Sequence, residues 1–479
     1  MTEQDLTQLI EADRRLSQSI IWDIQRRYFL QNGMRAWQDD VVPHTISSNP
    51  VMARAYSQVA FNYVRDCVTA VNNNTFSLNS EQPIYIVELG AGSGRLAYHF
   101  LHQFHDRLAQ SSLAELPIKF VMTDFVPEIV DFWQEHDHFK PWVEAGLLDF
   151  ALFDVGDKRP LTLRHAHLTL TPDLLQNPLI LIANYFFDSI PQDSFVIEDG
   201  QLCENLLTLY SSQPEPDLSD PTIWDRLELA YEAIPLMKPY YDVPEYNQIL
   251  DEYESQLPDA AISFPNVGLD CVRFWQGFGN ACVEPGRNGR ILLLSSDRGY
   301  TLPHDLIGQE NPLPNLHGSF SLMVNYHAIG QFVEQSGGLA LHPEHYQENI
   351  QVAAYLLGQL PQQGLETQQS FAEAIAMNGP NEFFAIKQAL APHLESLTLA
   401  QLLSYLRLSA WDADVFRDCF PTLLAHVQGE SPVWYADVAN AITHIQQQYL
   451  PLDETDDFEE MIRKLFEEMG IEENFLEAE

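Results

Sequence analysis

The chain has 479 residues, of which 46% are hydrophobic, enough for a sizeable core and for more than one domain. Its formal net charge of −43 would repel phosphate backbones, which argues against DNA or RNA as a partner and fits either a basic protein segment or simple solubility. The five cysteines lack CxxC spacing and no apolar run approaches the roughly 18 residues of a membrane span, so we expect reduced thiols, no zinc site, no membrane span and a cytoplasmic location.

Residues 1–75 are predicted to form an N-terminal helical segment that acts as a lid. Ile20, Ile21 and Ile24 recur at helical spacing and predict a helix over residues 1–32. A turn-rich stretch at 42–50 then leads to a second helix predicted over 51–71. The polar loop between them either covers a ligand of the following domain or is an ordinary solvent loop.

A short apolar strand and a glycine turn follow at residues 84–95. The strand reads Ile-Tyr-Ile-Val-Glu-Leu and is typical of a buried parallel strand. Gly90, Gly92 and Gly94 form a G-x-G-x-G turn, after which the chain turns helical. A strand, a glycine turn and a helix in this order place bare backbone N–H groups beside a ligand.

The residues around the turn distinguish between two kinds of ligand. A dinucleotide fold would prefer a further glycine at position 95, which is Arg95 here. Glu88 precedes the glycines, and E-x-G-x-G-x-G is similar to motif I of the class I S-adenosylmethionine (SAM) methyltransferases. This resemblance implies that Gly90, Gly92 and Gly94 contact SAM and that Glu88 orients the loop. The alternative is an ordinary strand-to-helix turn that tolerates glycine.

Three histidines lie on the helix after the glycine turn, at His99, His102 and His105. Zinc usually takes ligands at i and i+4 on one face with a third ligand elsewhere, and this spacing differs. We therefore expect a solvated helix face and no metal.

The next two strands each end in an acidic residue. Residues 118–123 end at Asp124, where nucleoside-binding α/β folds bind ribose hydroxyls; the alternative role is a helix N-cap. Residues 148–153 end at Asp154, which is suited to accept a hydrogen bond from an adenine amino group or belongs only to a turn.

A fourth strand at 179–183 leads into Asn184 and, four residues further, Asp188. Ligands of open α/β sheets bind beyond the carboxyl ends of the strands. These two residues are therefore the predicted catalytic residues, on the side of the site where the molecule that accepts the methyl group of SAM would bind. Asn184 can both donate and accept hydrogen bonds. The aromatic residues between them are expected to belong at least in part to the core.

Residues 184–191 resemble the N-E-F-x-D-A-x-P signature of the MidA family of SAM-dependent methyltransferases. Three further stretches resemble motifs of that family, namely 124–127, 292–300 and 317–326. The resemblance covers roughly residues 20–340. It implies protein arginine methylation and a role as an assembly factor for respiratory complex I. Tyr185 replaces a glutamate of the family signature, which leaves Asp188 as the carboxylate available to an acceptor guanidinium.

The core domain, predicted over 76–340, contains an insertion at about 205–288 that we expect to be a helical cap. Residues 195–202 predict a hairpin with Asp-Gly at its turn, and residues 222–258 are predicted to be helical and rich in aromatic residues. The aromatic residues are typical of a core rather than of a binding cage.

Residues 341–479 are predicted to form an α-helical domain with an acidic tail. Its predicted helices are 346–360, 370–377, 381–390, 399–408 and 434–450. Residues 453–479 combine many acidic residues with apolar residues at helical spacing. This domain either binds a protein partner, such as a basic one, or docks its tail on itself.

The sequence thus predicts an α/β class I methyltransferase with a Rossmann-like sheet, a helical cap and a C-terminal α-helical domain. The predicted cofactor is SAM, the predicted acceptor a protein side chain. A SAM-binding or degenerate scaffold that acts through protein–protein interaction is the main alternative. A small-molecule methyltransferase and, less well supported because of Arg95, a nicotinamide dehydrogenase are the others.

Overall fold

The computed structural model divides the chain into two compact units, each made of several segments. Unit 1 comprises Met1–His44, Tyr63–Gly92 and Leu116–Gln368, and unit 2 comprises Thr45–Asn62, Ser93–Glu115 and Gln369–Glu479. The domain boundaries expected near residues 75 and 340 stay predictions. The structure describes residues 8–38, 46–73, 77–157, 159–215, 217–218, 220, 222–278, 290–317, 319–345, 347, 349–358, 364–429, 432–452 and 457–471.

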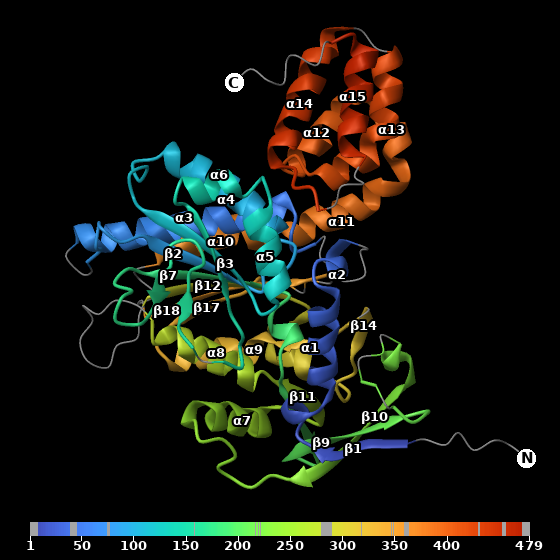
Figure 1. The fold of residues 1–479 in the computed structure, drawn as a ribbon. Helices are drawn as coiled ribbons and strands as arrows, with labels where there is room; N and C mark the ends of the chain where they lie inside the picture. The colour runs from blue at the N-terminus through green and yellow to red at the C-terminus, as the bar shows by residue number, and fades with distance from the viewer. Residues whose placement is uncertain are drawn as a thin grey trace, which may run out of the picture. The chain divides into compact units, whose positions relative to one another are not determined.

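A seven-stranded sheet forms the centre of unit 1, with the strand order β17-β18-β12-β7-β2-β3-β4 (Figure 1). Its strands are β2 (Ile84–Leu89), β3 (Ile118–Asp124), β4 (Leu148–Leu152), β7 (Leu179–Asn184), β12 (Ile291–Asp297), β17 (Leu339–Leu341) and β18 (Gln351–Leu357). The five strands from β12 to β4 are parallel, and β18 runs antiparallel to β12. The strand order reverses between β2 and β7, which is where open α/β sheets bind ligands. The predicted α/β sheet is confirmed.

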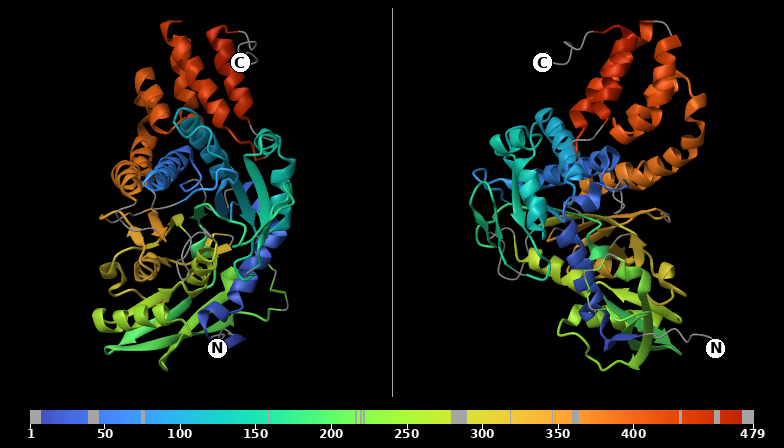
Figure 2. Two further views of the ribbon diagram at one scale, coloured as in Figure 1. Left: turned by 90° about the vertical axis from the view of Figure 1, so that its left-hand side faces the viewer. Right: turned by 45° about the vertical axis from the view of Figure 1, so that its right-hand side comes forward.

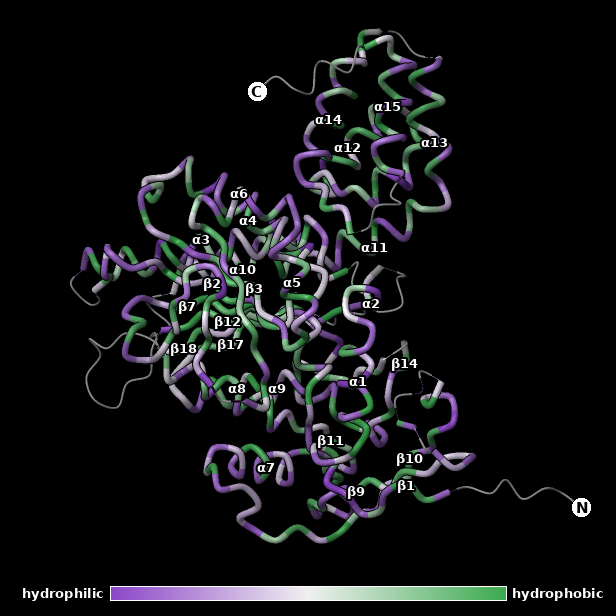
Figure 3. Tube along the Cα trace, in the orientation of Figure 1, coloured by the Kyte–Doolittle hydropathy of each residue, from purple (hydrophilic) through white to green (hydrophobic). Residues whose placement is uncertain are grey.

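One face of the central sheet packs on α8 (Asn266–Gln276) and α9 (Tyr326–Gln335) (Figure 1). Alternate residues of β2, Tyr85, Val87 and Leu89, belong to the same buried cluster as Leu269 of α8 and Ile329 of α9. The helices α5 (Pro127–Glu135) and α6 (Lys140–Glu144) connect β3 to β4. The central strands are therefore hydrophobic over most of their length, as Figure 3 shows around β12.

Two helical predictions in unit 1 fail where the segments pair as strands; the helix predicted over 1–32 is confirmed at 21–32 and wrong at 8–14. Residues 8–14 form β1 (Gln8–Arg14), which pairs with β9 (Gln201–Ser211), and α1 (Ile21–Asn32) begins only after it. The C-terminal helix predicted over 346–360 is instead β18, all of whose residues are buried between β12 and β17.

The insertion is not a helical cap but a mixed α/β layer. Its five-stranded sheet has the order β1-β9-β8-β11, with β10 also paired to β9. Figure 2 shows the green strands of this sheet near the label of the N-terminus. The sheet's other strands are β8 (Asp193–Glu198), β10 (Leu227–Pro235) and β11 (Ala260–Phe264). The helix α7 (Pro244–Gln256) lies between β10 and β11 in the chain. The predicted hairpin is confirmed at Asp199 and Gly200, whereas the helix predicted over 222–258 forms only in α7. Leu227, Leu229 and Tyr231 are partly buried and alternate with exposed residues, a two-residue period that favours a strand.

Unit 2 is helical and has its own core. Its helices after residue 369 are α11 (Pro380–Leu390), α12 (Leu399–Leu408), α13 (Ala413–Gly429), α14 (Tyr435–Gln448) and α15 (Phe458–Met469). Leu402, Phe416, Ile442 and Leu465 are four of its buried core residues, and Figure 3 shows the alternation of hydrophobic and hydrophilic turns along α13 and α15. The predicted helices at 381–390, 399–408 and 434–450 are confirmed.

Unit 2 also includes the first part of α3 (Pro50–Asn72) and α4 (Arg95–Ala109). Short helical segments flank the C-terminal helices, among them α10 (Leu365–Phe371). The acidic residues 472–479 of the predicted tail lie outside the described residues. No helix in the described ranges has the length and the hydrophobicity that crossing a bilayer requires.

Candidate functional site

The glycine turn follows β2 at the carboxyl edge of the central sheet. Gly90, Gly92 and Gly94 have φ values of 68°, 51° and 79°, a region that other residues adopt only with strain. The turn is fastened to β3, because the Thr123 hydroxyl donates to the Glu88 carbonyl at 2.7 Å and the Ala91 N–H donates to the Thr123 carbonyl at 2.8 Å. Gly94 immediately precedes α4.

Glu88 and Asp124 lie on the same face of neighbouring strands. Glu88 is in register with Met122, two residues before Asp124. Asp124 accepts hydrogen bonds from the N–H groups of Gly92 at 3.2 Å and Val126 at 3.0 Å. By contrast, Glu88 Oε2 is buried and has no hydrogen-bond partner among the described residues.

The burial of these two carboxyls has electrostatic consequences. Burial, together with the nearby charge of Asp124, raises the pKa of Glu88 to about 8. Burial likewise raises the pKa of Asp124 to about 6, against the opposing effect of its backbone hydrogen bonds. A buried carboxyl without a partner is a group that a polar ligand could satisfy.

Asp154 follows β4 at the same edge of the sheet and is bound by the N-terminal helix α1. Its carboxylate pairs with Arg26 at 2.5 Å and accepts from the Gly156 N–H at 3.1 Å. Arg26 also stacks over the Phe125 ring at 4.7 Å. The predicted adenine-binding carboxylate is thus in contact with the segment that was expected to form a lid.

Asn184 ends β7 and points to the same face as Glu88, because Ile182 is in register with Glu88. On the next strand, Ser296 is in register with Asn184, and its hydroxyl is buried without a hydrogen-bond partner among the described residues. Glu88, Asp124, Asn184 and Ser296 therefore line one face of four neighbouring strands. Sequence reasoning missed Ser296, since a serine at a strand end carries no distinctive pattern.

Asp188 lies beyond β7 and forms a buried pair with Asp297, the last residue of β12. Only 3% of Asp188 and none of Asp297 is exposed. Asp297 Oδ2 accepts hydrogen bonds from the Phe187 N–H at 3.2 Å and the Tyr326 hydroxyl at 3.1 Å, and Asp188 accepts from the Ser189 hydroxyl at 2.8 Å. Burial raises the pKa of Asp188 to about 7, and burial with the Asp188 charge raises the pKa of Asp297 further.

Both carboxyls therefore hold a proton more readily than exposed ones, because burial disfavours the ionisation of each and the Asp188 charge adds to this effect at Asp297. Sequence reasoning proposed Asp188 alone. Asp297 could have been found because it ends its strand as Asp124 does, but its partnership with a residue more than a hundred positions earlier has no local signal.

The histidines of α4 do not form the solvated face that was expected. His99 is only 4% exposed, and its two ring nitrogens have no hydrogen-bond partner within the described chain. Burial, reinforced by the charge of Arg95, lowers the pKa of His99 to about 3, so the ring is neutral. Among the described residues, no three His, Cys, Asp or Glu side chains are placed to hold a metal ion.

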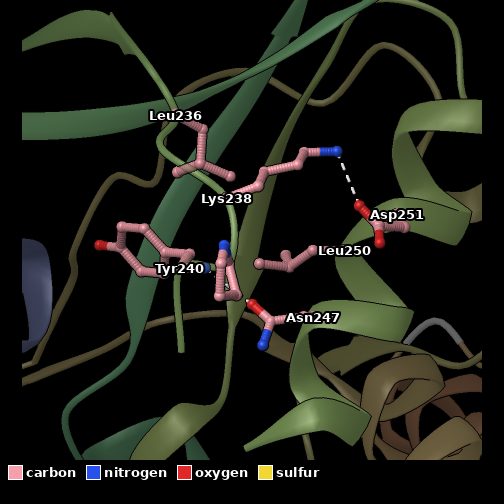
Figure 4. A pocket seen from close by; sticks show the side chains of 7 residues that line it. Leu236, Lys238, Tyr240, Asn247, Leu250 and Asp251 are labelled. Atoms are coloured by element: carbon pink, nitrogen blue, oxygen red, sulfur yellow. Dashed lines mark hydrogen bonds and ion pairs between the residues drawn. The ribbon is translucent and has the colours of Figure 1, made fainter. Parts of the chain in front are cut away.

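A separate cavity of about 330 Å³ lies beside α7 (Figure 4). Its lining includes Lys238, Tyr240, Asn247 and Asp251, and none of the predicted site residues. The polar atoms there bind one another: Lys238 donates to Asp251 at 2.7 Å, and the Asn247 side chain holds the backbone of Tyr240 and Tyr241. We therefore keep the carboxyl edge of the central sheet as the candidate site.

Comparison with protein families found one match. Residues 67–262 match the model of a family described as "Putative S-adenosyl-L-methionine-dependent methyltransferase", a range that contains the glycine turn and Asp188. No functionally curated protein matches the chain.

Two solved structures from Burkholderia thailandensis show a low similarity. An uncharacterized superfamily protein has 12% identity and a TM-score of 0.39, over 71% of this chain and 87% of that one. A superfamily member described as a "likely methyl transferase", bound to S-adenosyl-homocysteine, has 13% identity and a TM-score of 0.38. The match covers 65% of this chain and 78% of that chain. Neither score establishes a common fold by itself.

Proposed function

We propose that this protein transfers a methyl group from SAM to a protein side chain, because residues 67–262 match the model of a family described as "Putative S-adenosyl-L-methionine-dependent methyltransferase". The observation that supports it best is the glycine turn at the strand-order reversal, beside the buried Glu88 carboxyl, whose Oε2 has no hydrogen-bond partner among the described residues. These groups fit a cofactor that carries an amino acid and a ribose, since both present hydrogen-bond donors.

Each residue has a distinct part in this proposal. Gly90, Gly92 and Gly94 allow the backbone to approach the cofactor closely, Glu88 supports the turn, and Asp124 and Asp154 are the ribose and adenine acceptors. Asp124 already accepts from the Gly92 N–H and Asp154 from the Arg26 guanidinium, and each carboxylate has further lone pairs that could accept from another group. SAM, when bound, supplies a methyl group that is already activated on a positively charged sulfur.

The acceptor is proposed to enter beside Asn184. Methyl transfer to an activated sulfonium methyl depends mainly on positioning the acceptor and removing its proton. Asn184 can orient an acceptor nitrogen, and Asp188, whose pKa is raised to about 7, is the carboxyl proposed to take up its proton. The net charge of −43 favours a cationic acceptor, and arginine is the first candidate through the resemblance to the MidA family.

A methyl-labelling experiment tests the proposal. The purified protein is incubated with SAM carrying a radiolabelled methyl group and with proteins of a lysate, and labelled bands are compared for the unmodified protein, Gly92→Arg and Asn184→Ala. We expect labelled protein bands that disappear with Gly92→Arg and weaken with Asn184→Ala. Labelled metabolites without labelled protein would contradict the protein acceptor, and no labelled product at all would contradict the enzymatic function.

A SAM-binding scaffold is the second candidate, favoured by one feature of the acceptor side. Asp188 is buried and engaged with Ser189 and Asp297, so it does not present a free carboxylate to an acceptor guanidinium. If SAM binds but no product is labelled, the helical unit 2 becomes the place to look for a protein partner.

A further inference from the structure

We propose that Trp37 is a residue of the cofactor site that competes with the cofactor for the open face of Gly92. The inference rests on the proposed function, because it takes the glycine turn to be the SAM site. Trp37 was not among the predicted site residues, and no local pattern marks it.

The contact between Trp37 and Gly92 is close. A Cβ atom built on Gly92 would lie 2.7 Å from Cζ2, 3.0 Å from Cε2 and 3.1 Å from Cη2 of the Trp37 indole. The indole therefore occupies the space that the missing side chain leaves. That space is what a glycine provides for the close approach of a ligand, and here a side chain of the same chain fills it.

The other groups of the Gly92 peptide are also occupied. Its N–H donates to Asp124 at 3.2 Å, and its carbonyl accepts from the indole N–H of Trp133 at 3.1 Å. Trp133 is fully buried and is a fixed part of the core, whereas Trp37 is only half-buried. Of the two indoles on Gly92, Trp37 is the one that can leave without opening the core.

Trp37 is held in place by aromatic contacts within the N-terminal segment. It stacks on Phe29 of α1, with ring centroids 6.2 Å apart and an interplanar angle of 24°. The rings of Phe29 and Phe125 pack edge to face, with centroids 6.3 Å apart. Arg26 stacks over Phe125 and pairs with Asp154. The helix α1 and the short α2 (Arg35–Gln38) thus contact the cofactor side of the sheet at Gly92, Phe125 and Asp154.

These contacts are made by aromatic side chains and one partly exposed ion pair, and both kinds can separate without leaving a buried charge. Cofactor binding at Gly92 then requires the indole to move away from the turn. The apparent affinity for the cofactor then equals the intrinsic affinity multiplied by the fraction of molecules in which Trp37 leaves Gly92 uncovered.

The test is a calorimetric titration with S-adenosylhomocysteine (SAH) of the full-length protein and of Trp37→Ala, Trp37→Phe and Trp434→Ala. Trp434 is a half-buried tryptophan of unit 2 and serves as the matched control for the loss of an indole. We expect Trp37→Ala to bind SAH about threefold to tenfold more tightly than the unmodified protein, Trp37→Phe to lie between, and Trp434→Ala to be unchanged.

Tryptophan fluorescence provides a second readout. If the indole leaves Gly92 when SAH binds, the emission of the unmodified protein shifts on titration, and this shift is lost in Trp37→Phe but kept in Trp434→Ala. Weaker or equal SAH binding by Trp37→Ala would overturn the inference while leaving the proposed function standing. Absence of binding by all four folded proteins would overturn both, whereas binding by Trp37→Ala alone would support both.

Discussion

The two halves of the carboxyl edge of the central sheet are built in different ways. On the half formed by β2, β3 and β4, the polar groups include a glycine turn and a carboxyl, Glu88, that has an oxygen without a described partner. On the half formed by β7 and β12, Asp188 and Asp297 are buried and bonded to Phe187, Ser189 and Tyr326. The first half therefore presents a glycine turn and an unsatisfied carboxyl oxygen, whereas the carboxyl pair of the second half is tied to the folded core. The Ser296 hydroxyl on β12 is the exception in the second half, because it has no hydrogen-bond partner among the described residues.

This difference predicts how the two halves respond to mutation. Changes at the glycine turn should alter ligand binding more than stability, because the turn is covered by side chains that can move. Changes at the carboxyl pair should alter stability more than cofactor binding, because removing a buried hydrogen-bond acceptor leaves the N–H and O–H groups that donate to it unpaired.

The largest effect is expected for Gly92→Arg. The new side chain would need the space taken by the Trp37 indole and would face the ligand side of the turn, so we expect SAH affinity to fall by more than about 100-fold. The φ of +51° adds strain of about 1–2 kcal/mol. Calorimetric titration measures the affinity, and circular dichroism checks the fold.

Gly146→Arg is the matched control for this substitution. Gly146 has a φ of +76°, but a Cβ there would meet nothing within 4 Å. It therefore imposes a similar backbone strain without touching the glycine turn, and SAH affinity should be retained. Equal affinity in both variants would contradict the placement of the cofactor.

A smaller effect, on stability, is expected for Asp297→Ala. The substitution leaves the Phe187 N–H and the Tyr326 hydroxyl without their acceptor, so the free energy of unfolding should fall by about 2–4 kcal/mol. Asp297→Asn keeps an oxygen at this place and should lose less. Urea unfolding measures both, and an Asp297→Ala protein as stable as the unmodified one would show that the pair is not structural.

The smallest effect is a pH dependence at Glu88. Its pKa in the folded protein, about 8, lies above its ordinary value of 4.5, so the folded state holds the proton more tightly than the unfolded state. The contribution of Glu88 to the free energy of unfolding is fully present below about pH 4.5 and decreases as the pH rises toward 8. Allowing for relaxation around the buried group, the decrease should be about 1–2 kcal/mol between pH 5 and pH 7.

Glu88→Gln should remove this part of the pH dependence. Urea unfolding at pH 5, 6 and 7 is compared for the unmodified protein, Glu88→Gln and Glu81→Gln, an exposed acidic control. The difference in stability between the unmodified protein and Glu88→Gln should change with pH, whereas that with Glu81→Gln should not. A constant difference for Glu88→Gln would mean that Glu88 is charged in the folded protein.

The parallel strands could be predicted from the sequence because both of their faces are buried. The run Ile-Tyr-Ile-Val-Glu-Leu at β2 is apolar apart from Glu88, and the strands β3, β4 and β7 have the same character. The strand β18 was mistaken for a helix because Gln-Val-Ala-Ala-Tyr-Leu-Leu fits either structure, and its pairing with β12 and β17 decides between them.

The candidate site was predictable to the extent that its residues end strands. Asp124 and Asn184 could be named because a polar residue at the carboxyl end of a buried strand is conspicuous, and Glu88 because E-x-G-x-G-x-G resembles motif I. Trp37 and the pairing of Asp188 with Asp297 could not, since each depends on a contact between segments that are far apart in the chain. The same holds for β1, which is a strand only because β9 lies beside it.

Titration of the purified full-length protein with SAH, followed by calorimetry, tests the central claim most directly. The account predicts binding in the micromolar range with close to one site per chain, and loss of that binding in Gly92→Arg. A folded protein that gives no heat of binding, both unmodified and as Trp37→Ala, would contradict a cofactor site at the glycine turn.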